Sequence, residues 1–134
     1  MMRYLLDTNI CIYIIKKKPE PVIKKFTKLR PGSVAISSIS LSELYYGVVK
    51  SSKPNENMIA LQEFISPLIV LDFTDQDALF YGKIRVDLER KGKPIGAMDL
   101  LIAAIAKSRE LVLITNNVRE FSRISDLKIE NWVE

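Results

Sequence analysis

The chain has 134 residues, of which 48% are hydrophobic and 27% charged, and its formal net charge is +4. These values are typical of a single globular domain, here residues 1–134, and exclude a disordered chain. No apolar run approaches the ~18 residues of a membrane span, and the start lacks the pattern of a secretory signal. The single cysteine, Cys11, cannot form an internal disulfide and lies among isoleucines. We therefore expect a cytoplasmic protein without a membrane segment, in which Cys11 is a core residue.

The absence of histidine narrows the possible chemistry most. Without histidine, there can be no Ser-His-Asp triad, no Cys-His pair and no histidine-ligated zinc. A hydrolase of this composition must rely on carboxylates, which work best when they hold metal ions. Oxygen ligands select hard cations such as Mg²⁺ or Mn²⁺. The modest positive charge permits a phosphate-bearing partner but does not prove one.

Short apolar runs alternate along the chain with longer segments of helical periodicity. The runs predict strands at residues 4–6, 34–36, 68–71 and 111–114, with a further strand within 128–133. The segments between them predict helices over 10–18, 21–29, 38–48, 54–65, 75–90 and 97–107, and a short helix ending at Phe121. Asp75 is expected to cap the helix over 75–90. This alternation predicts an α/β domain with a mainly parallel sheet and right-handed crossovers.

Asp7 directly follows the first predicted strand. Ligands bind at the carboxyl ends of the strands in open α/β sheets, so a carboxylate at this position is a candidate functional group. The sequence alone leaves a second interpretation equally open, in which Asp7 or Thr8 only caps the next helix.

Three other acidic positions carry similar alternatives. Asp99 lies in the first turn of an otherwise apolar helix, where a buried charge is costly unless it is paired. It is either a metal ligand or a partner of the helix dipole at an exposed end. Glu43 forms the pattern of a capping box with Ser40, which would make it a structural residue. Asn117 and Glu120 repeat this spacing and carry the same alternative.

Four ordered motifs decide among these alternatives. They are Leu6-Asp7-Thr8-Asn9, Ser42-Glu43-Leu44-Tyr45-Tyr46-Gly47, Pro94-Ile95-Gly96-Ala97-Met98-Asp99 and Thr115-Asn116-Asn117-Val118-Arg119-Glu120-Phe121. In this order and spacing they resemble the motifs of PIN-domain ribonucleases, most closely the VapC-type toxins of bacterial toxin–antitoxin pairs. The resemblance extends from about Arg3 to Trp132. It implies a PIN-domain-like, Rossmann-like three-layer sandwich and a magnesium-dependent endoribonuclease that hydrolyses structured RNA and inhibits translation.

The resemblance also assigns roles to individual residues. Asp7 and Asp99 match the family's metal-binding aspartates, and Glu43 matches the acidic residue on the helix that follows the second strand. Glu43 is expected to act through a water molecule. The residues expected to steady these carboxylates through hydrogen bonds are Thr8, Asn9 and Thr115.

The sequence departs from the fullest family pattern at the fourth acidic position. Many PIN domains have an aspartate where this chain has Asn117, which completes the expected catalytic set. An amide can ligate or orient a water molecule but contributes no charge. The departure argues against a tightly held second metal ion, and Glu120 is expected to supply the missing charge less directly.

The resemblance implies macromolecular partners as well. The substrate is expected to be tRNA, and the basic residues expected to contact its backbone are Arg85, Arg90, Lys91 and Lys93. A VapB-type antitoxin is the expected protein partner. The chain is expected to form a homodimer and a larger complex with the antitoxin.

Three other functions stay open on the sequence. A phosphoacceptor signalling module is also a compact α/β domain with an acidic pocket, but it requires adjacent acids after the first strand, where this chain has Thr8 and Asn9. Asn117 is compatible with a PIN-like binding module that has lost catalysis. A PIN nuclease that processes RNA without being a toxin carries the same motifs, and an antitoxin gene immediately upstream would separate the two.

Overall fold

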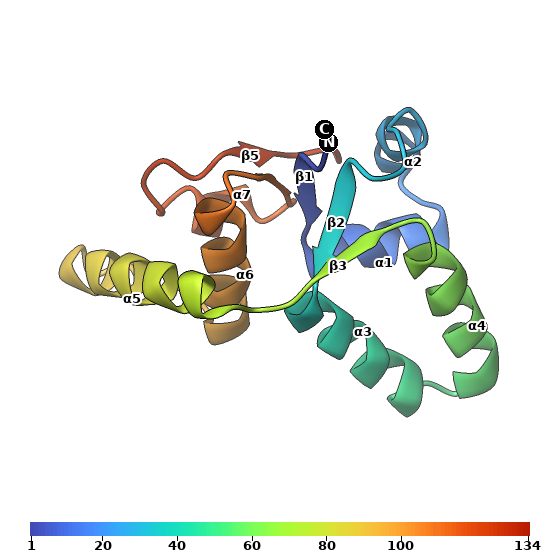
Figure 1. Cartoon of the computed structure of the whole chain (residues 1–134). Coiled ribbons are helices and arrows are strands. Elements are labelled where there is room, and N and C mark those ends of the chain that lie inside the picture. The colour runs from blue at the N-terminus through green and yellow to red at the C-terminus, as the bar shows by residue number, and fades with distance from the viewer.

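Five parallel strands form one sheet at the centre of the computed structural model, which describes residues 1–134 (Figure 1). They are β1 (Tyr4–Leu6), β2 (Val34–Ser37), β3 (Ile69–Leu71), β4 (Val112–Ile114) and β5 (Ile129–Glu130). Their order across the sheet is β3-β2-β1-β4-β5, so β1 is central and pairs with both β2 and β4. The parallel sheet confirms the predicted α/β fold class.

Seven helices connect these strands: α1 (Thr8–Lys16), α2 (Glu20–Thr27), α3 (Ser38–Lys50), α4 (Pro54–Ile65), α5 (Asp75–Arg90), α6 (Ala97–Ser108) and α7 (Val118–Phe121). They lie where the periodicity of the sequence predicts them. None of them is long and apolar enough to cross a membrane. The predicted last strand differs most, since β5 is only 2 residues long. Its only neighbour, β4, ends at Ile114, and beyond β5 the Asn131 side chain accepts the N–H of Val133 (2.9 Å).

The side chains of each strand alternate between two hydrophobic cores, which produces the predicted three-layer sandwich. Leu5 and its neighbour Leu113 belong to the core beneath α5 and α6. Leu6 and its neighbour Ile114 belong to the opposite core, beneath α1 to α4. Figure 1 shows these two groups of helices on opposite sides of the sheet. Cys11 is fully buried in the second core, as predicted, and burial raises the pKa of its thiol.

Helix α3 begins at Ser38, as the sequence predicts, but Ser40 is not its cap. Its N-cap is Ser37, whose Oγ accepts the N–H of Ser40 (2.9 Å). The predicted capping box of Ser40 and Glu43 is therefore wrong, and Glu43 lies in the second turn of the helix instead of the first. Several neighbouring serines were suitable caps, and the end of β2 at Ser37 selects the first of them.

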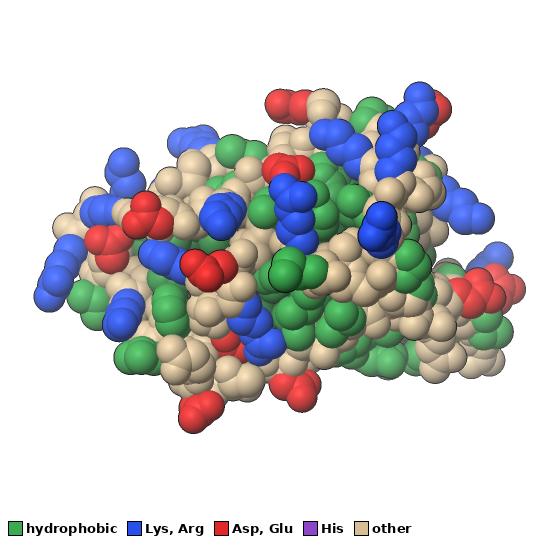
Figure 2. Space-filling view, turned by 45° about the horizontal axis from the view of Figure 1, so that its top comes forward, with side chains coloured by type: hydrophobic (Ala, Val, Ile, Leu, Met, Phe, Trp, Pro, Cys, Tyr) green, Lys and Arg blue, Asp and Glu red, His purple; other side chains and the backbone are tan.

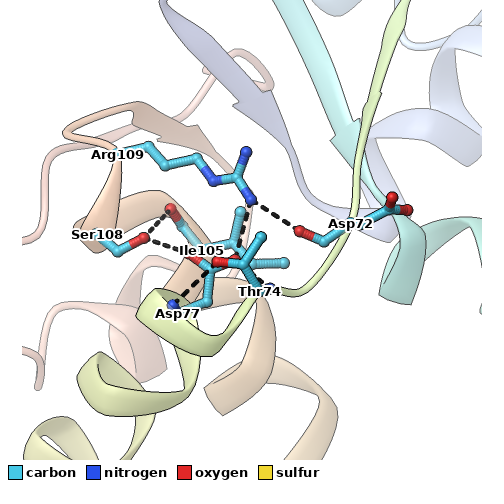
Figure 3. Close-up of polar contacts among 6 residues, drawn as sticks. All are labelled: Asp72, Thr74, Asp77, Ile105, Ser108 and Arg109. Atoms are coloured by element: carbon cyan, nitrogen blue, oxygen red, sulfur yellow. Dashed lines mark hydrogen bonds and ion pairs between the residues drawn. The ribbon is translucent and has the colours of Figure 1, made fainter.

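A cluster of polar side chains at the start of α5 forms hydrogen bonds with residues at the end of α6 (Figure 3). The N-cap of α5 is Thr74, not Asp75 as predicted, and Thr74 forms a reciprocal capping box with Asp77. Asp77 is only 1% exposed. Its Oδ2 accepts Nη2 of Arg109 (3.0 Å), and its Oδ1 accepts the hydroxyl of Ser108.

The arginine of this cluster also fixes the loop after β3. Arg109 Nη2 donates to the backbone carbonyl of Asp72 (2.7 Å). Burial by itself would raise the pKa of Asp77, but the hydrogen bonds from Arg109 and Ser108 outweigh it, and the pKa lies below its ordinary value. The ionised form of Asp77 therefore stabilises the junction of three segments that are distant in the sequence.

Replacing Asp77 with asparagine keeps the shape of the side chain and removes its charge. We expect Asp77→Asn to lower the free energy of unfolding by about 1–3 kcal/mol at neutral pH. Because the folded pKa lies below the unfolded value of about 3.9, this stabilisation is present above the unfolded pKa and is lost as the pH falls through the folded pKa. Urea titrations at decreasing pH measure the difference. An equal loss in Glu20→Gln, whose ion pair with Lys24 is exposed, would contradict the role of the cluster.

Candidate active site

Asp7 stands at the carboxyl end of β1, and only 5% of its surface is exposed. It is the N-cap of α1, and its Oδ1 accepts the N–H of Thr8 (2.8 Å). Its Oδ2 accepts the hydroxyl of Thr115, at the end of β4 (2.8 Å). The Thr115 oxygen in turn accepts the N–H of Asn117 (3.0 Å). Asp7 thus caps its helix as one interpretation predicted, but it is also oriented by the neighbouring strand, which capping does not require.

Glu43 reaches the same region from α3. The hydroxyl of Thr8 donates to Glu43 Oε1 (2.6 Å), and the hydroxyl oxygen of Ser40 lies 3.0 Å from that of Thr8. Because the single hydroxyl proton of Thr8 points to the carboxylate, Ser40 is the donor to Thr8. The sequence analysis missed this role of Ser40 by treating it as a cap. The run of serines was a signal that could have indicated this role. Only one serine can cap the helix, so the others are available for other hydrogen bonds.

Asp99, in the first turn of α6, and Glu120, in α7, border a common glycine. Glu120 Oε1 accepts the N–H of Gly96 (3.0 Å), and its Oε2 accepts the amide of Asn117 (3.2 Å). A Cβ atom on Gly96 would lie 3.7 Å from Asp99 Oδ2 and 3.9 Å from Glu120 Oε1. The predicted capping box of Asn117 and Glu120 is wrong, because Glu120 binds the backbone before α6 and no side chain caps α7. The donor role of Gly96 was not predicted.

The environment of Asp7 opposes its ionisation. Burial raises the pKa of Asp7, and the charges of Glu43 and Glu120 raise it further. The hydrogen bonds from Thr115 and Thr8 act in the opposite direction without cancelling the effect of burial.

Asp99 is affected more strongly. Burial, the neighbouring carboxyl group of Glu120 and the charge of Asp7 raise the pKa of Asp99 to about 7. The pKa of Glu120 lies below its ordinary value, chiefly because the N–H of Gly96 donates to its carboxylate. Of these two carboxyl groups, Asp99 therefore holds a proton more readily, and Glu120 is the one that ionises more readily.

The donor set of this site fits a hard divalent cation. Its carboxyl groups lie close enough for their charges to raise the pKa values of Asp7 and Asp99, and one amide lies beside them. The set is Asp7, Glu43, Asp99, Glu120 and Asn117. No three acidic, cysteine or histidine side chains already surround a single point as the ligands of a bound ion do. A cation would stabilise the charged forms of Asp7 and Asp99, which their surroundings otherwise disfavour. Oxygen ligands of this type are suited to Mg²⁺ or Mn²⁺.

The remaining predicted site residues lie outside this hydrogen-bond network. Asn9 is exposed, and no hydrogen bond joins it to a site carboxylate. All four residues predicted to bind the RNA backbone are exposed: Arg85, Arg90, Lys91 and Lys93. Two of them, Arg85 and Lys91, form ion pairs with acidic residues of α5. On the face that Figure 2 displays, basic side chains are interspersed with acidic ones. An RNA contact by these residues stays a prediction.

Comparison with known proteins identifies the family. The family model of the PIN domain matches residues 4–127. The chain is 48% identical to the tRNA(fMet)-specific endonuclease VapC of Salmonella typhimurium, over 98% of this chain and 99% of that protein. It is 44% identical to the ribonuclease VapC2 of Haemophilus influenzae, over 99% of this chain and 100% of that protein. The chain belongs to the VapC family of PIN-domain ribonucleases.

Solved structures agree with this assignment. The chain superimposes on DNA-bound VapBC from Salmonella typhimurium with a TM-score of 0.92 and 48% identity, over 98% of this chain and 99% of that one. VapBC2 from Rickettsia felis, bound to a fragment of its promoter DNA, gives a TM-score of 0.90 and 45% identity, over 98% and 99%. The predicted VapC-type fold and the endoribonuclease activity are thereby confirmed. PIN-domain nucleases of this kind depend on a divalent metal ion.

Thr115 offers a test of how the site is held together. Thr115→Val has nearly the same shape, but valine can neither donate to Asp7 nor accept from Asn117. We expect the free energy of unfolding to fall by about 1–3 kcal/mol. RNA cleavage should fall as well, because Asp7 loses the bond that orients it. Thr115→Ser keeps the hydroxyl and serves as the control. Equal cleavage rates per folded molecule in the two variants would mean that Thr115 does not orient Asp7 for the reaction.

Proposed function

We propose that residues 1–134 form a single PIN domain that acts as a magnesium- or manganese-dependent endoribonuclease toxin. The observation that supports this most is the convergence of Asp7, Glu43 and Asp99, from three separate segments, on one oxygen-only site. Asp7 and Asp99 are the metal ligands. Glu43 orients the attacking water molecule, and Asn117 supports the neighbouring carboxylate of Glu120.

Phosphodiester hydrolysis requires a water molecule in line with the scissile bond, a stabilised phosphate and a leaving oxygen. A divalent ion held by Asp7 and Asp99 would lower the pKa of the attacking water and neutralise charge on the phosphate. Thr115 keeps Asp7 in one orientation, and Thr8 does the same for Glu43. These bonds hold the carboxylates in place before the substrate arrives, which lowers the cost of reaching the transition state.

The proposed substrate is tRNA. The relative from Salmonella typhimurium, 48% identical over nearly the full length, is named a tRNA(fMet)-specific endonuclease. Cleavage of a tRNA would inhibit translation, and we place this action in the cytoplasm, where tRNA functions. The net charge of +4 is consistent with a polyanionic substrate.

Metal removal tests the mechanism directly. We expect EDTA to abolish RNA cleavage and an excess of Mg²⁺ or Mn²⁺ to restore it. Because water attacks the phosphorus, the products should carry 5′-phosphate and 3′-hydroxyl ends, as determined by ligation and mass spectrometry. Cleavage that persists in EDTA, or products with 2′,3′-cyclic phosphates, would rule out the roles given to Asp7 and Asp99.

Substitution of the two aspartates separates catalysis from structure. Asp7→Asn and Asp99→Asn retain shape but remove the charges that hold the metal. Each should abolish RNA cleavage and toxicity, while the free energy of unfolding in EDTA stays similar or rises, because repulsion among the carboxylates is relieved. Cleavage assays and urea denaturation of each variant check this. If both variants unfold easily but cleave RNA normally when folded, the aspartates are structural only.

The acidic site also indicates how a protein partner could inhibit the enzyme. The similar structures are VapBC assemblies, and a VapB-type antitoxin is the partner we assign to this chain. Several carboxylates attract a cation from any chain that covers them. Arginine suits them best, because its planar guanidinium binds two carboxylate oxygens at once and stays charged. We therefore place an arginine or lysine of the antitoxin's C-terminal segment at the site.

Replacing that antitoxin residue with alanine should restore RNA cleavage within the complex at sufficient Mg²⁺. Much of the binding affinity should persist, because the rest of the interface is unchanged. Cleavage assays and calorimetry on the purified complex measure the two effects separately. Inhibition that survives the substitution, in a complex whose acidic site is open to solvent, would place the inhibitory contact elsewhere.

A further inference from the structure

The positive charge of the chain is concentrated in residues 16–30, which include the end of α1, all of α2 and the turn after it. This basic segment holds seven of the 20 basic residues and one of the 16 acidic ones. The seven are Lys16 to Lys18, Lys24, Lys25, Lys28 and Arg30. The segment therefore carries a charge of +6 and the rest of the chain carries −2, which together give the net charge of +4.

Almost none of this charge is neutralised within the chain. All seven side chains are exposed, and only Lys24 forms an ion pair, with Glu20 (3.3 Å). By contrast, Arg85 and Lys91, which were predicted to bind RNA, are paired with acidic residues of α5. Like charges that are not paired repel one another and lower the stability of the folded state. Their concentration in one segment therefore has a cost that the fold itself does not recover.

The helix dipoles account for only part of this charge. Lys16 lies in the last turn of α1, and Lys24 and Lys25 lie in the last turn of α2, where cations are favourable. Each helix end carries only about half a negative elementary charge. Two such ends therefore offset about one positive charge of the segment. The rest is available to an anion outside the chain.

The basic segment lies at the opposite end of α1 from the acidic site. Asp7 caps the start of α1 and Lys16 ends the helix, so a rise of about 1.5 Å per residue separates them by about 14 Å. Figure 1 shows α2 at the end of the sheet where β1 and β2 begin, whereas the site lies where they end. Asn9, Tyr13 and Lys16 share one side of α1, at spacings of four and three residues. Because α1 contains no acidic residue, this side does not repel a polyanion that extends from the site to the segment.

We propose that the basic segment binds the phosphate backbone of the RNA substrate at a distance from the bond that is cut. At about 3.4 Å per base pair of a duplex, about 14 Å corresponds to about four base pairs. A helical stem can therefore lie on the segment while an adjoining strand enters the acidic site. The proposal rests on the proposed ribonuclease function and names the part of the RNA that is bound outside the site. It makes structured RNA a better substrate than a short single strand.

Other anionic partners fit this surface less well. A helix that binds a membrane surface inserts apolar side chains, and no large apolar side chain of the basic segment is exposed. RNA carries a charge on every nucleotide, which matches a run of cations better than the scattered carboxylates of a protein segment. Lysines suit phosphates because they act as point charges that require no fixed orientation.

Partial neutralisation of the basic segment tests the proposal. The triple variant Lys24→Gln, Lys25→Gln and Lys28→Gln should lower kcat/KM by about tenfold or more, chiefly through KM. The substrate is tRNA(fMet), which is named for the relative from Salmonella typhimurium. The slope of log kcat/KM against log salt concentration should fall by about two to three, since about one unit is lost per phosphate contact. Cleavage of a short single-stranded RNA that spans only the cleaved bond should not change.

A second triple variant controls for net charge. Lys50→Gln, Lys53→Gln and Lys83→Gln remove the same charge from exposed positions outside the segment, and cleavage of tRNA(fMet) should stay near that of the wild type. Thermal melting confirms that both variants are folded. Equal losses in the two variants would mean that only net charge matters, and equal losses on the two RNAs would mean that the effect arises at the acidic site. Either result would overturn the proposal.

Binding without cleavage separates this proposal from the nuclease function. In an Asp7→Asn background in EDTA, the triple variant of the basic segment should bind tRNA(fMet) about tenfold more weakly, as measured by fluorescence anisotropy. A wild-type chain that binds the tRNA through this segment but does not cleave it would contradict the nuclease function and still support the RNA contact. A triple variant that binds tRNA normally but binds the antitoxin more weakly would assign the segment to the antitoxin and overturn the proposal.

Cross-linking tests where the RNA lies. Lys25→Cys carries the only accessible thiol, because Cys11 is fully buried. Labelled with a photoreactive maleimide in the Asp7→Asn background, it should cross-link to nucleotides of a stem about four base pairs or more from the cleaved bond. Ile59→Cys, exposed on α4, is the matched control and should cross-link poorly. Equal cross-linking of the two variants, or cross-links confined to the cleaved bond, would show that the RNA does not lie on the basic segment.

Discussion

A buried carboxylate at the end of the central strand is the constraint on which the site depends. Asp7 is almost inaccessible to water, and a buried charge is costly unless hydrogen bonds satisfy it. The parallel register of β1 and β4 provides one of these hydrogen bonds. It sets Leu6 beside Ile114 and so brings the Thr115 hydroxyl to the Asp7 side chain. A shift of one residue would turn Thr115 to the other face of the sheet. The register that builds the two cores therefore also builds the site.

The other acidic groups of the site lower the stability of the folded protein, because several carboxyl groups lie close together. Burial, together with the neighbouring carboxyl groups of Glu120 and Asp7, raises the pKa of Asp99 to about 7 and so disfavours its ionisation. A protein without a use for this arrangement gains nothing from repelling carboxyl groups, and clusters of perturbed acids are concentrated at functional sites for this reason. The Asp77 cluster at the other end of α6 is different, because Arg109 balances its charge and its pKa is lowered. The two clusters distinguish a site that requires a cation from a junction that already contains one.

The sequence predicted the strands, the helices and the main acidic residues, because apolar runs and ordered motifs are local signals. It also predicted that Thr8 and Thr115 bind these acids, but it did not predict which carboxylate each of them binds, nor the donor role of Gly96. Thr8 bonds to Glu43 only because α1 and α3 pack together on one face of the sheet, and Glu120 reaches Gly96 across 24 positions of sequence. Such contacts follow from tertiary packing, which single-sequence patterns do not contain. The predicted cap residues were wrong for a related reason. Several neighbouring residues can cap a helix, and the point at which the preceding segment ends decides which of them, such as Ser37, does so.

The amide at Asn117 has a physical explanation within this network. Its nitrogen donates to Glu120 (3.2 Å), whose other oxygen is held by the N–H of Gly96. An aspartate at 117 would instead place a like charge against Glu120, which two hydrogen bonds keep ionised. The chain therefore carries its fourth negative charge on α7 and uses residue 117 to orient it. On the proposed mechanism, the loss of an acid at the end of β4 does not reduce the charge of the site, and Asn117 is a supporting residue and not a sign of lost catalysis.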